Sequence, residues 1–342
     1  MAGATSTVTI RQIITVIKRF KFKELETAVM PCFPEISWTH LRSELVKHHV
    51  QFTVANMTRM FEIALIDARL PEKVLQNRLS TLETIDISRH STRKIWYGYA
   101  LLDCKQSVKH LVNREIEQTI KDQFRTYDID IAVRIVTYNG VTYISLKEPK
   151  RRGKSQQSLA THFAIFLGQK CFFCTKKGVS SATISLLISS LGFNSSRKLK
   201  LSGRDLKSLS ALCWKRKQGA LNAENINKPP IYKEAPPTVK NAGVDFTQLK
   251  QRKQYAENCF GADAPTLELL TLNGQDQNWT SDHVSEKLAD NNINVKWEFR
   301  SRSVITFLTE LIARRILITP VPSYIAEFTK LGANEFTLKT DT

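Results

Sequence analysis

Apolar residues between positions 8 and 80 recur every three or four residues, which is the period of an amphipathic helix. The pattern breaks at Pro34 and before Pro71, and Ser37 stands where a helix N-cap is expected. Helices are therefore predicted over 10–17, over 23–32, after Ser37 with Leu41, Leu45 and Val46, over 54–65 and from Pro71 to 79. Short helices in such close succession can bury one core, so residues 1–80 are predicted to form a small helical bundle.

The period changes to two near residue 129. Ile129, Ile131, Val133 and Ile135 alternate with polar or small residues, which predicts a half-buried strand. Asn139-Gly140 supplies the two positive-φ residues of a tight hairpin turn, so an antiparallel return strand is predicted over 141–146. Further strands are predicted over 160–167 and 170–175, and helices over 180–191 and 203–216.

Two stretches lack a clear period. Residues 81–102 are mixed and are predicted to be a linker, followed by a helix over about 103–126. Residues 218–245 are polar, contain two Pro-Pro pairs and are predicted to be a second linker. The resulting division is a bundle (1–80), a linker (81–102), a basic α+β domain (103–217), a linker (218–245) and a C-terminal α+β region (246–342). The fold class predicted for the whole chain is α+β.

The C-terminal region is close to neutral and rich in apolar segments. Strands are predicted over 266–272 and 293–299 and a helix over 303–315. A region this small has a thin core, so its apolar residues either dock on a partner protein or close its own core. The predicted partner-binding residues are Leu267, Leu269, Trp297, Phe299, Leu308 and Leu311.

The net charge of +18 is concentrated in one block. Residues 146–217 contain 16 Lys and Arg against only Glu148 and Asp205, a net charge of +14. The net charge is +4 over 1–80, +1 over 81–145 and −1 over 218–342. Such a block attracts a polyanion, with an affinity that falls with salt as counterions are released. The alternative interpretation is a solvated surface that keeps the protein soluble.

The basic positions lie in four short segments that we expect to converge on one end of a sheet. These segments lack the interleaved aromatic side chains of a single-strand binder, and no base-reading motif appears. Contact with duplex phosphates is therefore predicted. The predicted DNA-binding residues are Lys147, Lys150, Arg151, Arg152, Lys154, Lys176, Lys177, Arg197, Lys198, Lys200, Arg204 and Lys207.

Two patterns offer alternative chemistry. Asp130, Glu148 and Lys150 imitate the carboxylate and lysine set of a metal-dependent nuclease, but Pro149 disfavours a strand there. Cys171 and Cys174 form a lone CxxC whose side chains would point to opposite faces of a strand, so we expect no zinc site. No cofactor is expected. The cysteines are scattered, and neither a secretory signal nor a long apolar run appears, so cytosol or nucleus is expected and no membrane partner.

Three stretches resemble the centromere protein N family. Leu201-Ser202-Gly203-Arg204-Asp205-Leu206-Lys207-Ser208-Leu209 is similar to that family's Leu-Arg-Ser-Arg-x-Leu-x-Ser-Leu segment. Ala256-Glu257-Asn258-Cys259-Phe260-Gly261, followed by Pro265-Thr266-Leu267-Glu268, is similar to its Thr-Phe-Gly…Pro-x-Leu-Glu segment. Lys23-Glu24-Leu25 resembles the opening of its pyrin-like bundle, and the order of elements agrees over nearly the whole chain.

This resemblance implies a pyrin-like, death-fold bundle that faces centromeric nucleosomes containing the histone CENP-A. It implies a C-terminal region that forms a heterodimer with centromere protein L, other inner kinetochore subunits as partners, and a place at the centromere in the nucleus. The bundle residues that would face the nucleosome are Arg11, Lys18, Arg19, Lys47, His48 and His49. Glutamates that read a histone arginine in the family are missing, because no acid precedes Glu24.

Together these features predict a non-enzymatic chromatin adaptor that binds centromeric nucleosomes and supports kinetochore assembly and chromosome segregation. The alternatives are the metal-dependent nuclease and a general scaffold whose basic block binds RNA or an acidic protein.

Overall fold

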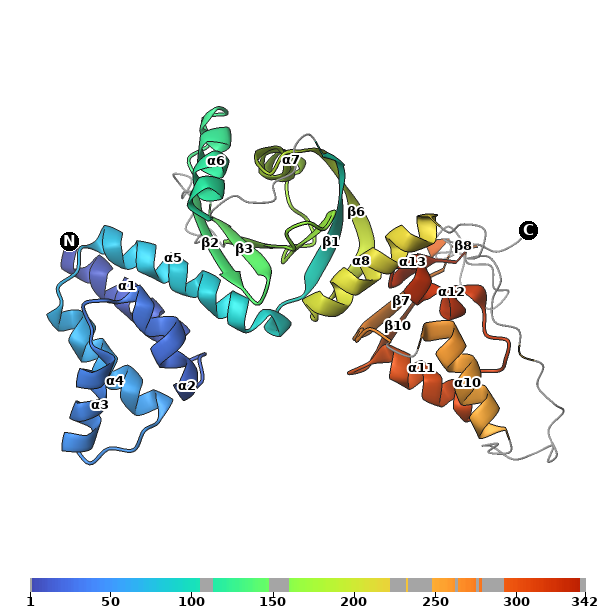
Figure 1. The fold of residues 1–342 in the computed structure, drawn as a ribbon, viewed down its shortest axis with the longest axis horizontal. Helices are drawn as coiled ribbons and strands as arrows, with labels where there is room; N and C mark the ends of the chain where they lie inside the picture. The colour runs from blue at the N-terminus through green and yellow to red at the C-terminus, as the bar shows by residue number, and fades with distance from the viewer. Residues whose placement is uncertain are drawn as a thin grey trace, which may run out of the picture. The chain divides into compact units, whose positions relative to one another are not determined.

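The computed structural model describes most of the chain (Figure 1). The chain forms two compact units. The described residues are 2–104, 113–147, 160–221, 232, 248–261, 264–274, 277–278 and 292–338. The first unit comprises 1–94, 103–169 and 178–195, and the second comprises 95–102, 170–177 and 196–342.

The first unit opens with the predicted helical bundle. Its elements are α1 (Ala2–Ile17), α2 (Phe22–Glu24), a π-helical turn (Leu25–Val29), a 3₁₀ turn (Met30–Cys32), α3 (Trp38–Lys47), α4 (Val54–Asp67) and α5 (Glu72–Arg89). The N-cap prediction is confirmed, because the Ser37 hydroxyl accepts a hydrogen bond from the backbone N–H of His40 at 3.4 Å. The α-helix predicted over 23–32 is only partly present. The α-helical part lasts three residues, and a π-helical turn and then a 3₁₀ turn follow it.

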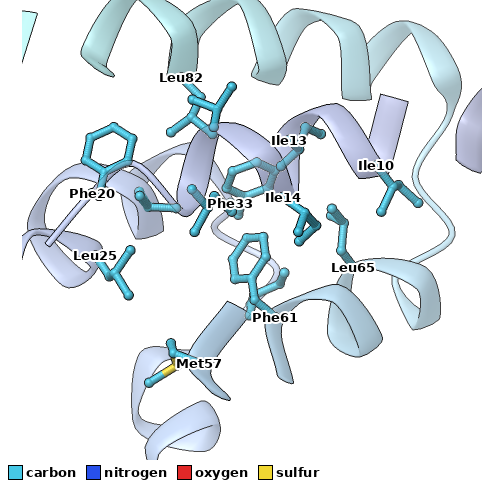
Figure 2. Packing of buried hydrophobic residues seen from close by; sticks show 14 of the residues in the cluster. Ile10, Ile13, Ile14, Phe20, Leu25, Phe33, Met57, Phe61, Leu65 and Leu82 are labelled. Atoms are coloured by element: carbon cyan, nitrogen blue, oxygen red, sulfur yellow. The ribbon is translucent and has the colours of Figure 1, made fainter. Parts of the chain in front are cut away.

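The core of the bundle is formed by the apolar stripes of the predicted helices (Figure 2). Ile13, Leu45 and Leu82 are fully buried, and the Phe33 and Phe61 rings meet edge to face at 5.0 Å. Each such side chain contributes roughly 1.5–3 kcal/mol on burial, so this core is the main source of stability for the bundle. Val46 is the exception to the expected stripe, because 60% of it is exposed.

An antiparallel sheet and two more helices complete the first unit. The elements are a 3₁₀ turn (Ser91–Arg93), α6 (Asn113–Arg125), β2 (Ala132–Tyr138), β3 (Val141–Lys147), β4 (Thr161–Ile165) and α7 (Ser181–Ser190), with the strands in the order β2-β3-β4. The hairpin is confirmed: Tyr138 pairs with Val141, and Asn139 and Gly140 have φ of 49° and 76°.

Residues 81–102 are regular structure, so the linker expected there is wrong. α5 continues to Arg89, and β1 (Trp96–Cys104) follows almost at once. The helix expected over 103–126 is described over Asn113–Arg125, and residues 103–104 belong to the strand instead. The sequence did not predict β1 because this strand buries large side chains on both faces and so shows no alternation of apolar and polar residues. Trp96, Tyr99 and Leu101 are all buried.

The second unit contains strands in the order β5-β1-β6 and a long helix. β5 (Cys171–Cys174) runs antiparallel to β1, and the Tyr99 and Phe172 rings stack with centroids 4.9 Å apart. β6 (Phe193–Gly203) was not predicted; its basic residues were expected to lead directly into a helix. That helix, α8 (Leu206–Leu221), starts three residues later than expected and buries Leu206, Leu209 and Leu212 as predicted.

The C-terminal part of the second unit has a mixed sheet with helices. The elements are α10 (Leu249–Phe260), β7 (Leu269–Asn273), β8 (Gln277–Asn278), β9 (Asn292–Ile293), β10 (Lys296–Arg300), α11 (Val304–Ala313), α12 (Ser323–Ala326), α13 (Phe328–Leu331) and β11 (Glu335–Thr337). The sheet order is β10-β7-β11, with β10 antiparallel and β11 parallel to β7. Gly332 packs so tightly on α8 that a Cβ there would lie 2.7 Å from the Leu212 carbonyl oxygen.

Asn334 joins β6 to the C-terminal sheet. Its side-chain oxygen accepts from Ser202 N–H at 3.0 Å, and its amide donates to the carbonyls of Ser202 and Leu269 at 2.6 and 2.9 Å. Its backbone N–H also donates to the Lys200 carbonyl at 2.9 Å. Asn334 is 2% exposed, so one buried amide satisfies strand groups that would otherwise be left without partners.

The fold is therefore α+β with an antiparallel sheet and a mixed sheet, as predicted. The pyrin-like character of the bundle remains a prediction. The linker expected over 218–245 lies almost wholly outside the described residues. Within the described ranges, no helix has both the length and the apolar character needed to cross a membrane.

Candidate nucleic-acid interface

Lysines from the turn after β5 and from the middle of β6 come together beside Cys174. The Lys198 ammonium donates a hydrogen bond to the Lys177 carbonyl oxygen at 2.5 Å. Burial raises the pKa of the Cys174 thiol to about 11, although the nearby ammonium groups of Lys176 and Lys198 act in the opposite direction. Both lysines thus lie close to one thiol, and the turn after β5 meets β6, a strand that the sequence did not predict.

Lys198 and Lys200 share one face of β6. Leu199 and Leu201 point to the other face and are buried, while both lysines are exposed. β6 is the outer strand of the order β5-β1-β6. Lysines on an outer strand also discourage edge-to-edge aggregation, which is the structural alternative to a binding role. We name Lys176, Lys177, Lys198 and Lys200 the lysine cluster.

Three further predicted residues lie near this strand in the chain but differ in their surroundings. Arg197 is exposed on β6. Arg204 lies in the turn between β6 and α8, and its Nε is 3.2 Å from the Glu268 carboxylate, so this cation is partly neutralised. Lys207 is exposed in the first turn of α8, where its backbone N–H donates to the Asp205 side chain at 3.2 Å.

Lys147 belongs to the first unit and ends β3. It is half-buried near Glu83 of α5; burial raises the pKa of Glu83, and the Lys147 charge reduces that rise. Lys150, Arg151, Arg152 and Lys154 lie outside the described residues, so their predicted role stays a prediction.

The nucleosome-facing residues predicted in the bundle are exposed, and three of the six lie near an acidic side chain. Arg19 lies 3.1 Å from Asp86, and Lys47 and His48 lie 3.7 and 3.4 Å from Glu44. His49 lies two residues after the end of α3 and has φ of 51°. Arg11 is exposed on α1, and Lys18 is exposed directly after its last residue.

A buried acidic centre in the bundle was missed by the sequence reasoning. Asp86 Oδ1 lies 2.9 Å from His90 Nδ1 and 3.4 Å from Arg93, and His90 Nε2 lies 3.3 Å from Glu24. Burial raises the pKa of Glu24, but the Lys21 backbone N–H and His90 lower it more, so that pKa lies below its ordinary value. The sequence offered one signal, an acid between the apolar residues Ile85 and Ile87 of α5.

The predicted partner-binding residues divide into two groups. Leu267 and Leu308 are 1% and 0% exposed and fill the unit's own core, so they offer no surface. Leu269, Phe299 and Leu311 are half-buried, and Trp297 is 50% exposed on β10. Burial of the α11 stripe favours the interpretation that this helix closes the unit's own core.

The candidate nuclease set lies mostly outside the described residues. Asp130 is exposed, while Glu148 and Lys150 lie outside the described residues. Among the described residues, no three His, Cys, Asp or Glu side chains gather as metal ligands would. Cys171 contacts the thiol of Cys213, a pairing that the sequence reasoning missed.

Comparison with known proteins adds no further identification. No protein-family model matches the chain, and no curated protein matches it.

Proposed function

We propose that this protein is a non-enzymatic chromatin adaptor that binds duplex DNA of nucleosomes through backbone phosphates. The observation that carries the proposal is the lysine cluster, in which the turn after β5 and the strand β6, separated in the sequence, bring like charges together. Among the described residues, Lys177, Lys198 and Lys200 form no ion pair with a carboxylate.

Three lysines without a carboxylate partner among the described residues, Lys177, Lys198 and Lys200, suit a phosphate backbone better than they suit a base edge. Lysine is a flexible point charge with three donors, and it binds phosphate without fixing a base-specific geometry. The outer strand β6 presents Lys198 and Lys200 two residues apart on one face. Successive phosphates of a strand lie at a comparable spacing, so both ammonium groups can contact one backbone.

The test is the salt dependence of binding to a fluorescent 30-base-pair duplex, measured by anisotropy with the full chain. Each phosphate contact contributes about −0.9 to the slope of log K against log salt. Lys198→Ala should weaken binding about tenfold and reduce the magnitude of the slope by about one, equally for different duplex sequences.

The matched control is Lys250→Ala, which removes an exposed lysine from α10 in the same unit. The control should leave both affinity and slope unchanged. Equal losses in the two variants would show that net charge, not the lysine cluster, governs binding. Cleavage of the duplex by the wild type with Mg²⁺ would instead favour the nuclease alternative.

The centromeric assignment rests on the resemblance to the centromere protein N family. In this proposal the bundle faces the nucleosome, and an arginine of CENP-A needs a carboxylate partner. Glu24 and Glu44 already contact cationic or imidazole groups, whereas Glu26 is exposed and has no ion pair within the described part of the chain. Any preference for CENP-A nucleosomes should therefore depend on Glu26.

Paired binding assays can test this dependence. We expect a modest preference of the wild type for CENP-A over ordinary nucleosomes at matched salt, and its loss in Glu26→Gln with duplex affinity unchanged. A preference that survives Glu26→Gln would contradict the role of this glutamate.

The same resemblance supports a heterodimer with centromere protein L through the C-terminal part. β10 is an outer strand that carries the half-exposed Trp297 beside Phe299 on one face, so it can extend a partner's sheet. Trp297→Asp should abolish co-purification with that protein. Ile318→Asp, at a side chain 70% exposed, is the control that should retain it.

A further inference from the structure

A basic cavity in the first unit lies apart from the lysine cluster and shares only Asp130 with the candidate sites discussed above. It has a volume of about 440 Å³ and is lined by Lys73, Asn77, Lys121, Arg125, Asp130, Ile131, Ala132 and Arg134. These residues come from α5, α6 and the segment that enters β2. A second cavity of about 330 Å³ shares Asn77 and Arg134 with it and continues along α5 past Val74 and Thr81.

Arg134 is held in place in the shared wall. Its Nη2 donates to the Asn77 side-chain oxygen at 2.7 Å, and its Nη1 donates to the Val133 carbonyl at 2.8 Å. Nη1 also lies 3.2 Å from Glu117 Oε1. A guanidinium has five donors, so some remain for a ligand, and a fixed side chain loses little further entropy when the ligand binds.

The charges around the cavity leave a positive excess. Lys121 and Arg134 share the single carboxylate of Glu117, at 2.6 and 3.2 Å. Lys73 is exposed and has no ion pair within the described residues. Four cations thus face Glu117 and Asp130, a net charge of +2. Asp122 approaches Arg125 only at 3.8 Å, with both side chains more than half exposed, so it compensates little.

A phosphomonoester matches this arrangement. It carries a charge of about −1.5 to −2 and three acceptor oxygens, which suit converging lysines and arginines. A duplex phosphate carries one charge and lies on a convex backbone, whereas these cations come from three elements around a concave site. Neither cavity lining includes an aromatic side chain, so a nucleobase would find no stacking surface.

We propose that the cavity lined by Lys73, Lys121, Arg125 and Arg134 binds a phosphoserine or phosphothreonine side chain of a partner peptide. The adjoining cavity, with Val74 and Thr81, receives the residue next to the phosphorylated one. This site is independent of the proposed duplex binding, because it lies in the first unit and shares no residue with the lysine cluster.

The test uses the full chain and a fluorescent peptide library with a central phosphoserine and degenerate flanks. We expect at least tenfold tighter binding than the unphosphorylated library, and at least a tenfold loss in the double variant Lys73→Ala, Arg125→Ala. Both side chains are exposed, so the variant should keep its fold, checked by an unchanged Tm. The control is Arg114→Ala, which removes an exposed arginine from α6, the helix that carries Arg125. This variant should bind the phosphopeptide as the wild type does.

Three outcomes would overturn the proposal. The phosphorylated and unphosphorylated libraries could bind equally. Inorganic phosphate could bind as tightly as the phosphopeptide library, which would leave no role for a peptide. A duplex could lose affinity in the double variant as much as the phosphopeptide does, which would assign the cavity to nucleic acid. Retention of duplex affinity in that variant, with loss of phosphopeptide affinity, supports it.

Discussion

The helical bundle and the lysine cluster both carry many cations, but they differ in where their acids lie. In the bundle, Arg19 contacts Asp86 and Arg78 contacts Glu35. In the lysine cluster, Lys177, Lys198 and Lys200 have no carboxylate within ion-pair distance among the described residues. The number of cations therefore does not identify a polyanion surface; the distribution of the acids does.

This difference has a physical basis. A cation with a carboxylate partner must give up part of that interaction before it binds a phosphate, whereas an uncompensated lysine gives up only water and counterions. Grouped like charges also repel one another, so binding of a polyanion relieves that repulsion. The comparison predicts which variants should weaken duplex binding and which should weaken the fold.

The largest expected effect is on duplex binding. Reversal of three charges in Lys177, Lys198, Lys200→Glu should reduce affinity for a free duplex about 1,000-fold at low salt, because three charge-assisted contacts become repulsive. Charge reversal of the paired bundle cations in Arg19, Lys47→Glu should cost less than about tenfold. Anisotropy titrations would measure both. Similar losses in the two variants would break the comparison.

The next largest effect is on stability, through the contacts that Asn334 makes to β6, the strand that carries Lys198 and Lys200. Asn334→Ala removes three buried side-chain hydrogen bonds to Ser202 and Leu269, and should lower the free energy of unfolding by about 3 kcal/mol. Urea unfolding would measure it. Asn273→Ala, which loses a 3.5 Å contact to Glu335, is the control and should cost well under 1 kcal/mol.

A smaller loss is expected in the bundle when its central acid is neutralised. Asp86→Asn weakens contacts to Arg19, His90 and Arg93 and should cost about 2 kcal/mol, because the acid is only 7% exposed as a side chain. Asp122→Asn, more than half exposed, should change stability by less than about 0.5 kcal/mol. Equal effects would show that these bundle cations are not held by Asp86.

The smallest expected effects are on the pH dependence of stability, which should differ in sign between Glu24 and Glu83. The pKa of Glu24 is lowered, so its ionised form stabilises the fold, and this contribution is lost as pH falls through the folded-state pKa. The pKa of Glu83 is raised by burial, so its ionisation opposes folding, and stability falls as pH rises through that pKa. At pH 7, Glu24→Gln should lower Tm and Glu83→Gln should raise it slightly. Thermal melts at decreasing pH should show both differences shrinking in the acid range; a difference that stays constant would contradict the assignment.

Some of this structure was determined by the sequence alone. The bundle helices follow from apolar spacing, and the Asn139-Gly140 turn fixes the hairpin, because a helix face and a tight turn are set by residues a few positions apart. The basic block is also visible without a structure, since it is a count over a contiguous segment.

Other features depended on tertiary structure. β6 was missed because its alternation Lys198-Leu199-Lys200-Leu201 lies between stronger helix signals, and only pairing within a sheet makes it a strand. The contact between Lys198 and Lys177 spans 21 residues, and that of Asn334 with Ser202 spans 132. Burial of Leu267 and Leu308, and the cavity between α5, α6 and β2, likewise arise from packing between distant segments. Sequence patterns report local period and charge, whereas burial, ion pairing and cavities require knowing which distant residues fold against each other.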